Sequence, residues 1–420
     1  MSNRQQARGA AAARSKGPRL WPLLALNFFM ADFQAGIGPF LGVFLQAHGW
    51  LDGLIGTVMT AGGIAGMLVI APAGALVDAT PYKRLCIVLL GICTILGSGL
   101  LLLSQNFWVV IASQVATAAA GTAIGPAIFG LTLGLVRQRG FNRQLGRNQA
   151  ANHAGNVAGA ALSGYLGYVY GLNAVFWLAA GFGVATIASV LAIPADAVNH
   201  RAARGAKIEG DGAGEIGGLD ILVKHKPLLI LGAALCCFHL GNAAMLPFYG
   251  LALVARGAGD PAGSVAITIV VAQAVMVPAS LLAARLVERG GSWPVLLVSF
   301  LALPLRGVIA ALVTARWGVY PVQILDGIGA GLQSVAVPGL VARLLDGSGR
   351  VNVGQGAVMT LQALGAAVSP LFAGWIAQLF GYGPMFLALG GVALVSSVLW
   401  LGFAPALKPA ERDADAASGA

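Results

Sequence analysis

Long apolar segments recur along the whole chain, and they constrain its fold more than any other feature. A helix needs about 20 mostly apolar residues to cross a bilayer. Only 10% of the residues are charged, whereas soluble proteins carry about 25%. The sequence therefore predicts an all-α membrane protein with twelve transmembrane helices. These cover residues 20–45, 53–77, 85–104, 108–136, 148–170, 173–194, 227–254, 263–287, 293–314, 317–345, 355–380 and 383–405.

The polar segments divide these helices into two equal groups. The longest polar connection, residues 195–226, is rich in glycine and mixed charges, as flexible linkers are. It separates a unit of six predicted helices at 20–194 from a second unit at 227–405. We expect a disordered basic tail at 1–19 and a short polar tail at 406–420, with no appended catalytic domain. The first apolar segment is too long for a signal peptide, so we expect it to be retained as a helix.

The basic residues lie almost entirely on one side of this arrangement. If the helices alternate from a cytoplasmic N-terminus, every Lys and Arg except Arg256, Arg306 and Arg316 falls on the cytoplasmic side or at its edge. Cytoplasmic loops of membrane proteins carry such an excess. The net charge of +10 therefore indicates topology rather than nucleic-acid binding, and we expect both termini in the cytoplasm.

Two sequence patterns repeat at about half the length of the chain. Gly155, Gly164, Gly171 and Gly181 recur 210 residues later as Gly365, Gly374, Gly381 and Gly391. The segment Gly74–Asp78 has a degraded copy at Ala284–Glu288. The chain is therefore predicted to consist of two diverged copies of one membrane unit, an organisation that places substrate sites between the copies in many transporters.

The connection between the second and third predicted helices resembles the signature of the major facilitator superfamily. That signature is Gly-x-Leu-x-Asp followed by Arg, Gly and a basic pair. The matching residues are Gly74, Leu76, Asp78, Lys83 and Arg84, whereas Ala79 and Pro81 depart from the pattern. The resemblance implies two six-helix bundles joined by a cytoplasmic linker, and a role for Asp78 in latching onto a neighbouring helix in one state of the transport cycle. A basic loop that sets topology, with a helix cap, is the alternative interpretation.

Three charged residues lie inside predicted membrane helices, where charges are rare and mark functional or paired groups. Asp32 is near the middle of the first helix, and a lone carboxylate there is a natural proton carrier because its charged form is poorly solvated. A structural hydrogen bond is the alternative. Asn27 and Gln34 share one helix face and Asp32 points away from them, so these three side chains cannot all face one cavity.

Arg306 and Asp326 stand at matching depths on consecutive antiparallel helices. Each is about nine residues from the turn near Arg316, so the two charges are predicted to form a buried ion pair with a structural or gating role. Separate roles are the alternative, with Asp326 facing the cavity and Arg306 binding backbone carbonyls.

Neutral polar residues recur at helical spacing in the helices that, by the resemblance, line a central cavity. We expect Gln34, Gln114, Asn242 and Gln323 to contribute to a substrate cavity, and Asp32, His239 and Asp326 to serve proton coupling. For any one of these amides, packing between helices is the alternative, because polar side chains also hold membrane helices together.

The chain lacks the sequence motifs of the competing classes of membrane protein. It has no phosphate-binding Gly-Lys-Ser/Thr loop, no paired Asp motif and no His-Glu-x-x-His motif, so ATP-driven transport and intramembrane catalysis are not expected. We predict a monomeric secondary transporter of the cytoplasmic (inner) membrane that exports a small organic solute in exchange for protons. Proton-coupled uptake of a nutrient, metabolite or organic acid is the alternative. No metal, cofactor or nucleic acid is expected.

Overall fold

A computed structural model describes residues 20–35, 37–80, 82–194, 197–198, 225–257, 259–345 and 351–407. Within these ranges the protein is all-α and contains no β-strand. The predicted N-terminal tail, nearly all of the predicted linker and the tail beyond Leu407 lie outside the described residues.

The helices follow the predicted segments closely. The N-terminal half contains α2 (Trp21–Ala35), α3 (Ile37–Ala47), α4 (Asp52–Ala79), α5 (Lys83–Leu103), α6 (Phe107–Tyr170) and α7 (Asn173–Leu191). The C-terminal half contains α10 (Lys226–Asn242), α11 (Met245–Ala255), α12 (Pro261–Gly290), α13 (Ser292–Leu312), η1 (Arg316–Gly318), α14 (Val319–Leu344), α15 (Val351–Phe380) and α16 (Tyr382–Gly402). Among the described residues, 10 segments are long and apolar enough to cross a membrane, a number that fits the twelve predicted helices.

Helix α6 contains two of the predicted spans. Its backbone leaves the helical conformation at Arg137, where φ is 55°. The two halves fold back on each other, since Asn148 Nδ2 donates to Thr132 Oγ1 at 3.0 Å across the turn. Gln144 Nε2 donates to Asn148 Oδ1 at 2.9 Å, so these buried polar side chains hold the hairpin together.

The first span of the C-terminal half is broken rather than continuous, which the apolar pattern did not predict. In the C-terminal half, α10 ends at Asn242 and α11 begins at Met245. Pro247 has no N–H with which to bond the Ala243 carbonyl, so the regular helical ladder is interrupted there. The hydroxyl of Ser369 on α15 accepts a hydrogen bond from the Ala244 N–H at 2.9 Å. A side chain from a helix distant in the sequence thus accepts a hydrogen bond from a backbone N–H at the break.

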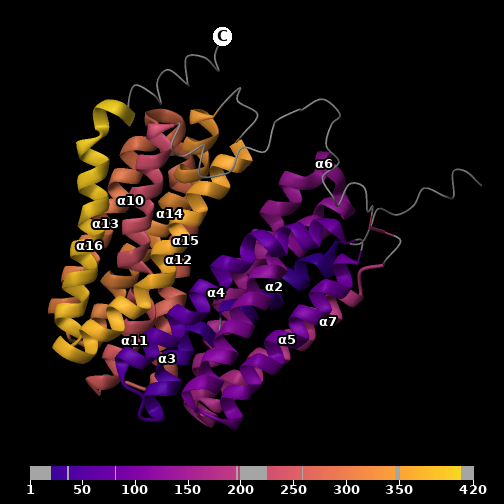
Figure 1. Cartoon of the computed structure of the whole chain (residues 1–420), viewed down its shortest axis with the longest axis horizontal. Coiled ribbons are helices and arrows are strands. Elements are labelled where there is room, and N and C mark those ends of the chain that lie inside the picture. Colours follow the sequence, from indigo (N-terminus) through magenta and orange to yellow (C-terminus); the bar gives the residue numbers. More distant parts are fainter. Residues whose placement is uncertain are drawn as a thin grey trace, which may run out of the picture.

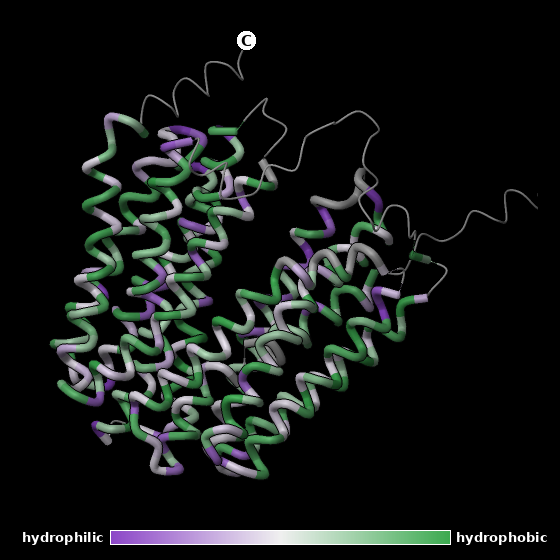
Figure 2. Tube along the Cα trace, in the orientation of Figure 1, coloured by the Kyte–Doolittle hydropathy of each residue, from purple (hydrophilic) through white to green (hydrophobic). Residues whose placement is uncertain are grey.

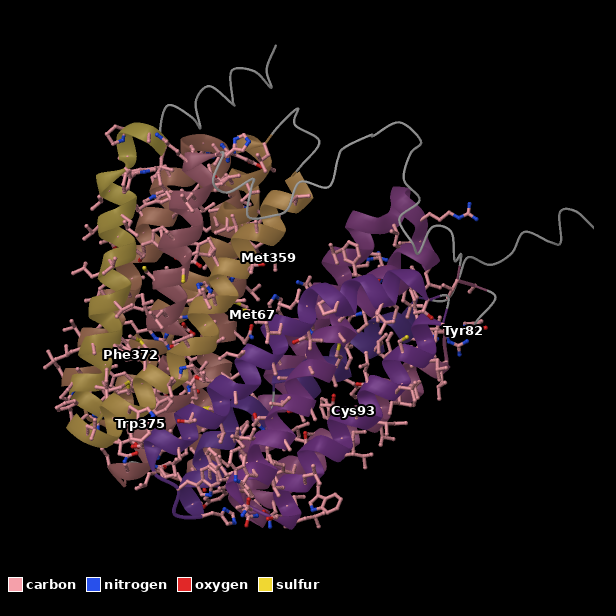
Figure 3. The ribbon with its side chains drawn as sticks, in the orientation of Figure 1. Met67, Tyr82, Cys93, Met359, Phe372 and Trp375 are labelled. Carbon is pink, nitrogen blue, oxygen red and sulfur yellow. The ribbon has the colours of Figure 1, made fainter. Side chains whose placement is uncertain are left out.

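The two halves form separate bundles that meet at one end and diverge toward the other (Figure 1). At the joined end, α3 lies beside α11, and α4 and the second half of α6 pack against α15 and α12. The C-terminal end of α16 lies at the diverging end (Figure 1). Met67 of α4 and Met359 of α15 lie on the facing sides of the two bundles (Figure 3). Hydrophobic residues run along most helices, and hydrophilic residues gather mainly at helix ends (Figure 2). This distribution fits a chain embedded in a bilayer.

The glycines spaced by 210 residues occupy equivalent places in the two bundles. A Cβ at Gly155 would collide with the Phe28 carbonyl of α2, and one at Gly365 with the Cys236 carbonyl of α10. Gly171 and Gly381 both have positive φ, at 83° and 87°, a conformation that glycine adopts without strain. The repeat in the sequence is therefore a repeat in three dimensions.

The same symmetry builds the contact between the bundles. Gly164 of α6 lies against Ala266 of α12, and its counterpart Gly374 of α15 lies against the Asp52 carbonyl of α4. Gly56 of α4 approaches the Pro370 carbonyl so closely that no side chain fits between them. Small residues allow membrane helices to approach this closely.

Candidate functional site

A cavity of about 440 Å³ lies between the two bundles. Its wall is formed by α3, α4, α5, the first half of α6, the α10–α11 break and α15. Among the described residues that line it, none carries a charge, and the polar side chains come from Thr94, Ser98, Gln114 and Thr117. The structure thus places Gln114 in the wall of the central cavity. Such a lining suits a neutral or weakly charged solute, because a fully charged one would lose its hydration without gaining a partner.

A buried cluster of charged and amide side chains lies beside this cavity. Arg306 Nη1 of α13 donates to Asp326 Oδ1 of α14 at 2.8 Å. The same Nη1 donates to Asn242 Oδ1 at 2.5 Å, and Nη2 donates to Gln323 Oε1 at 3.3 Å. The Arg306 side chain is 0% exposed and that of Asp326 is 13% exposed. The two charges are thus in direct contact, and the carboxylate is the member that solvent reaches.

The break in the first span of the C-terminal half explains why the arginine is tolerated there. Asn242 is the last residue of α10, and helix C-termini carry partial negative charge that favours a nearby cation. Ala243, the next residue, lines the central cavity. The cluster therefore adjoins the cavity through the end of α10.

Gln323 was predicted to contribute to a substrate cavity, and in this structure its side chain contacts Arg306. Its side chain is 0% exposed, and its amide oxygen accepts from Arg306. Its Nε2 and the Nε of Arg306 have no hydrogen-bond partner within the described residues. The reason is that a buried guanidinium needs acceptors on several sides, which turns Gln323 toward Arg306.

His239 lies on α10, one turn before Asn242, and its ring makes two contacts. Its Nδ1 is 3.2 Å from the Leu235 carbonyl, and its Nε2 is 2.8 Å from Gln362 Nε2. A neutral ring satisfies both, since Nδ1–H donates to the carbonyl and Nε2 accepts from the amide. Adding a proton to Nε2 would require Gln362 to reverse its amide.

The predicted site residues of the first span are only partly described. Asp32 and Gln34 lie on α2, and their side chains are outside the described part of the structure. Asn27 is buried, and its Nδ2 donates to the Leu23 carbonyl at 2.7 Å. Asn152 Nδ2 of α6 donates to the Asn27 carbonyl at 3.4 Å. Asn27 therefore contributes to the contact between α2 and α6.

The basic residues after α4 contact a neighbouring helix. Arg84 Nε and Nη2 donate to the carbonyls of Val190 and Leu191 at 3.3 and 3.0 Å, which caps the C-terminus of α7. Lys83 is 2% exposed. The side chain of Asp78 and the surroundings of Gly74 lie outside the described part of the structure. Arg84 thus attaches the connection between α4 and α5 to α7, within the N-terminal bundle.

A polar network at the joined end was missed at the level of sequence. Tyr382 Oη donates to Asp52 Oδ1 and accepts from Gln46 Nε2, both at 3.0 Å. The Gly53 N–H donates to Gln378 Oε1 at 3.0 Å. The sequence carried one signal of it, because an acidic residue stands at the start of equivalent helices in the two halves. Asp52 begins α4, and Asp260 precedes α12. These bonds tie the two bundles together across the joined end.

The family model of the Major Facilitator Superfamily matches residues 23–352. The chain belongs to this superfamily. It is 37% identical, over 378 residues and 90% of both chains, to the MFS-type transporters Rv2456c and MT2531 of Mycobacterium tuberculosis. As a Major Facilitator Superfamily protein it is a multi-pass membrane transporter and not an enzyme.

Solved structures of Major Facilitator Superfamily transporters share the fold. A point mutant of the nucleoside transporter NupG superposes with a TM-score of 0.77 at 13% identity, covering 91% of this chain and 98% of NupG. A bacterial homologue of the human lysosomal transporter Spinster, inward-facing and unoccupied, gives a TM-score of 0.74 at 13% identity and covers 94% and 99%. At such identities the likeness establishes the fold alone.

Proposed function

We propose that this protein exports a neutral or weakly cationic amphipathic solute from the cell in exchange for protons, by alternating access. The Arg306–Asp326 pair carries the proposal. A proton on Asp326 would change a buried interaction, because Asp326 is accessible and Arg306 is not.

Protonation of Asp326 removes the countercharge of a fully buried arginine. Arg306 is then left with the amide oxygens of Asn242 and Gln323. An uncompensated buried charge costs about 3–5 kcal/mol. The protonated state therefore favours a rearrangement of α13 and α14 against α10 that solvates Arg306 again, which couples the proton to movement of the C-terminal bundle.

The direction of the opening follows from the basic residues. The basic residues stand at helix ends or turns: Lys83 and Arg84 begin α5, Arg137 is at the turn of α6, Lys226 begins α10 and Arg289 is in the last turn of α12. These helix ends lie on the diverging side (Figure 1). The positive-inside rule assigns that side to the cytoplasm. We therefore take the described state as inward-open, with both termini in the cytoplasm of a cell whose inner membrane holds the monomer.

Two further residues complete the proposal. Asp32 is the candidate second proton carrier, in the N-terminal bundle. Asp78 is the candidate latch after α4, acting beside the attachment of Arg84 to α7. We give His239 no role as a carrier, because its two contacts fit a neutral ring.

Transport into everted membrane vesicles with an acidified lumen tests the proposal. The probes are the amphipathic dye Hoechst 33342, a neutral monoacylglycerol and the nucleoside uridine. An amphiphile should accumulate in the lumen with the gradient present, and accumulation should cease when nigericin collapses it. Asp326→Asn should lose the response to the gradient. Accumulation that ignores the gradient would refute proton coupling, and proton-driven movement of uridine out of the lumen would establish uptake instead.

A further inference from the structure

A long apolar groove runs along the outer face of the N-terminal bundle, between α5 and α7. It has a volume of about 540 Å³ and extends on α5 from Ile95 to Leu103, about 12 Å at the helical rise. Phe176, Trp177 and Ala179 of α7 form the opposite wall. Leu96, Leu103 and Trp177 are largely exposed, so in a bilayer this groove opens to the lipid tails.

The groove and the central cavity share one lining residue. Ser98 lines both of them. Its neighbours are Gly97, which packs against Thr117 of α6, and Gly99, whose Cβ position has no atom within 4 Å. One turn of α5 with no side chain larger than that of serine therefore separates the apolar groove from the cavity wall that carries Thr94, Gln114 and Thr117.

The polar side of this junction is suited to groups that donate hydrogen bonds. Thr94 Oγ1 donates to the Leu90 carbonyl at 3.0 Å, and Thr117 Oγ1 donates to the Ser113 carbonyl at 2.8 Å. Each hydroxyl has given its proton and keeps lone pairs for an incoming donor. Gln114 adds an amide to the same wall. A headgroup bearing hydroxyl or amide N–H groups fits this chemistry.

We propose that the substrate is a neutral single-chain amphiphile, which binds with its alkyl chain in the α5–α7 groove and its hydroxyl- or amide-bearing headgroup in the cavity beside Ser98. This inference rests on the proposed transport function and specifies its substrate class. It also gives the substrate a lateral path from the bilayer to the cavity.

Photo-crosslinking to the purified protein in lipid nanodiscs tests the inference without any transport measurement. The probe is a monoacylglycerol with a diazirine near the end of its acyl chain, and a diazirine alkane without a headgroup serves for comparison. Labelled peptides are mapped by mass spectrometry. The monoacylglycerol should label residues between Ile95 and Leu103 and the facing segment of α7.

Two variants and one control separate the groove from the cavity. Gly99→Leu fills the groove, and monoacylglycerol labelling should fall about tenfold, which corresponds to about 1.4 kcal/mol of binding. Gly391→Leu, at an equally open glycine on α16, should leave labelling unchanged. Gln114→Leu should reduce labelling by the monoacylglycerol and not by the alkane.

The outcomes are distinct from those of the transport assay. Labelling of the groove that is the same for both probes and insensitive to Gln114→Leu would show an ordinary lipid contact and overturn the inference. Absence of labelling at the groove would also overturn it. Neither labelling result would bear on the proposed proton-driven export, which the Hoechst 33342 assay tests separately.

Discussion

At the scale of single residues, the molecule concentrates its buried charge at Arg306. The guanidinium is surrounded by one carboxylate and two amide oxygens from two other helices. Removing one member of a buried ion pair leaves the other without compensation, whereas replacing both by apolar side chains is often tolerated. We therefore expect the Arg306–Asp326 pair to contribute more to the coupling of protons to transport than to the free energy of unfolding.

Leucine substitutions distinguish these two contributions. Arg306→Leu and Asp326→Leu should each destabilise the protein by about 3–5 kcal/mol, and the double variant should be more stable than either single one. All three should lose gradient-driven transport. Thermal unfolding of the purified proteins provides the measurement, with the exposed Arg316→Leu as a control expected to change stability by less than about 0.5 kcal/mol. Additive losses in the double variant would contradict the pair.

Only part of this cluster could be predicted from the sequence. The shared depth of Arg306 and Asp326 follows from counting residues from a turn, and it brings them to within one helical turn of each other. The acceptors Asn242 and Gln323 could not be predicted in the same way. Helical spacing shows which residues share a face, but the rotation of each helix against its neighbours decides what that face contacts.

At the scale of elements, glycines set how closely the helices approach. Gly56 of α4 meets the backbone of Pro370 and Gly374 on α15 with no room for a side chain. The spacing of 210 residues predicted that Gly374 repeats Gly164, and it did not predict the partners of these two glycines, because those partners lie in the other bundle. The break between α10 and α11 was likewise not predictable from local sequence, since Ser369, which satisfies it, is 125 residues away.

Adding one methyl group at this contact should separate the helices. Gly56→Ala is expected to destabilise the protein by about 1–3 kcal/mol, the usual effect of overpacking, and to weaken the joined end. Gly391→Ala provides the control, because its Cβ position is open and alanine is the better helix former. The melting temperature of the purified proteins checks the prediction. Equal melting temperatures for the two variants would refute a tight α4–α15 contact.

At the scale of the whole molecule, the scaffold repeats and the chemistry does not. Equivalent glycines hold equivalent helices in both bundles, and both pairs of helices at the joined end use small residues. The described ion pair belongs to the C-terminal bundle, whereas the polar wall of the cavity comes largely from the N-terminal one. The proposed alternating access requires the joined end to open while the diverging end closes.

A reversible cross-link between α4 and α15 tests whether the two bundles must separate there during transport. A Cβ at Gly63 would lie 3.2 Å from the Cβ of Ala367, close to the separation of about 3.5–4.5 Å in disulfides. The pair Gly63→Cys/Ala367→Cys is introduced after the four free cysteines, Cys86, Cys93, Cys236 and Cys237, are replaced by alanine. Each single cysteine variant serves as a control for oxidation.

The measurement is gradient-driven accumulation of Hoechst 33342 in everted vesicles, before and after oxidation. The cross-linked double variant should lose transport, reduction should restore it, and oxidation should leave the single variants unaffected. Full transport by completely cross-linked protein would show that the joined end does not need to open and would refute the proposed alternating access.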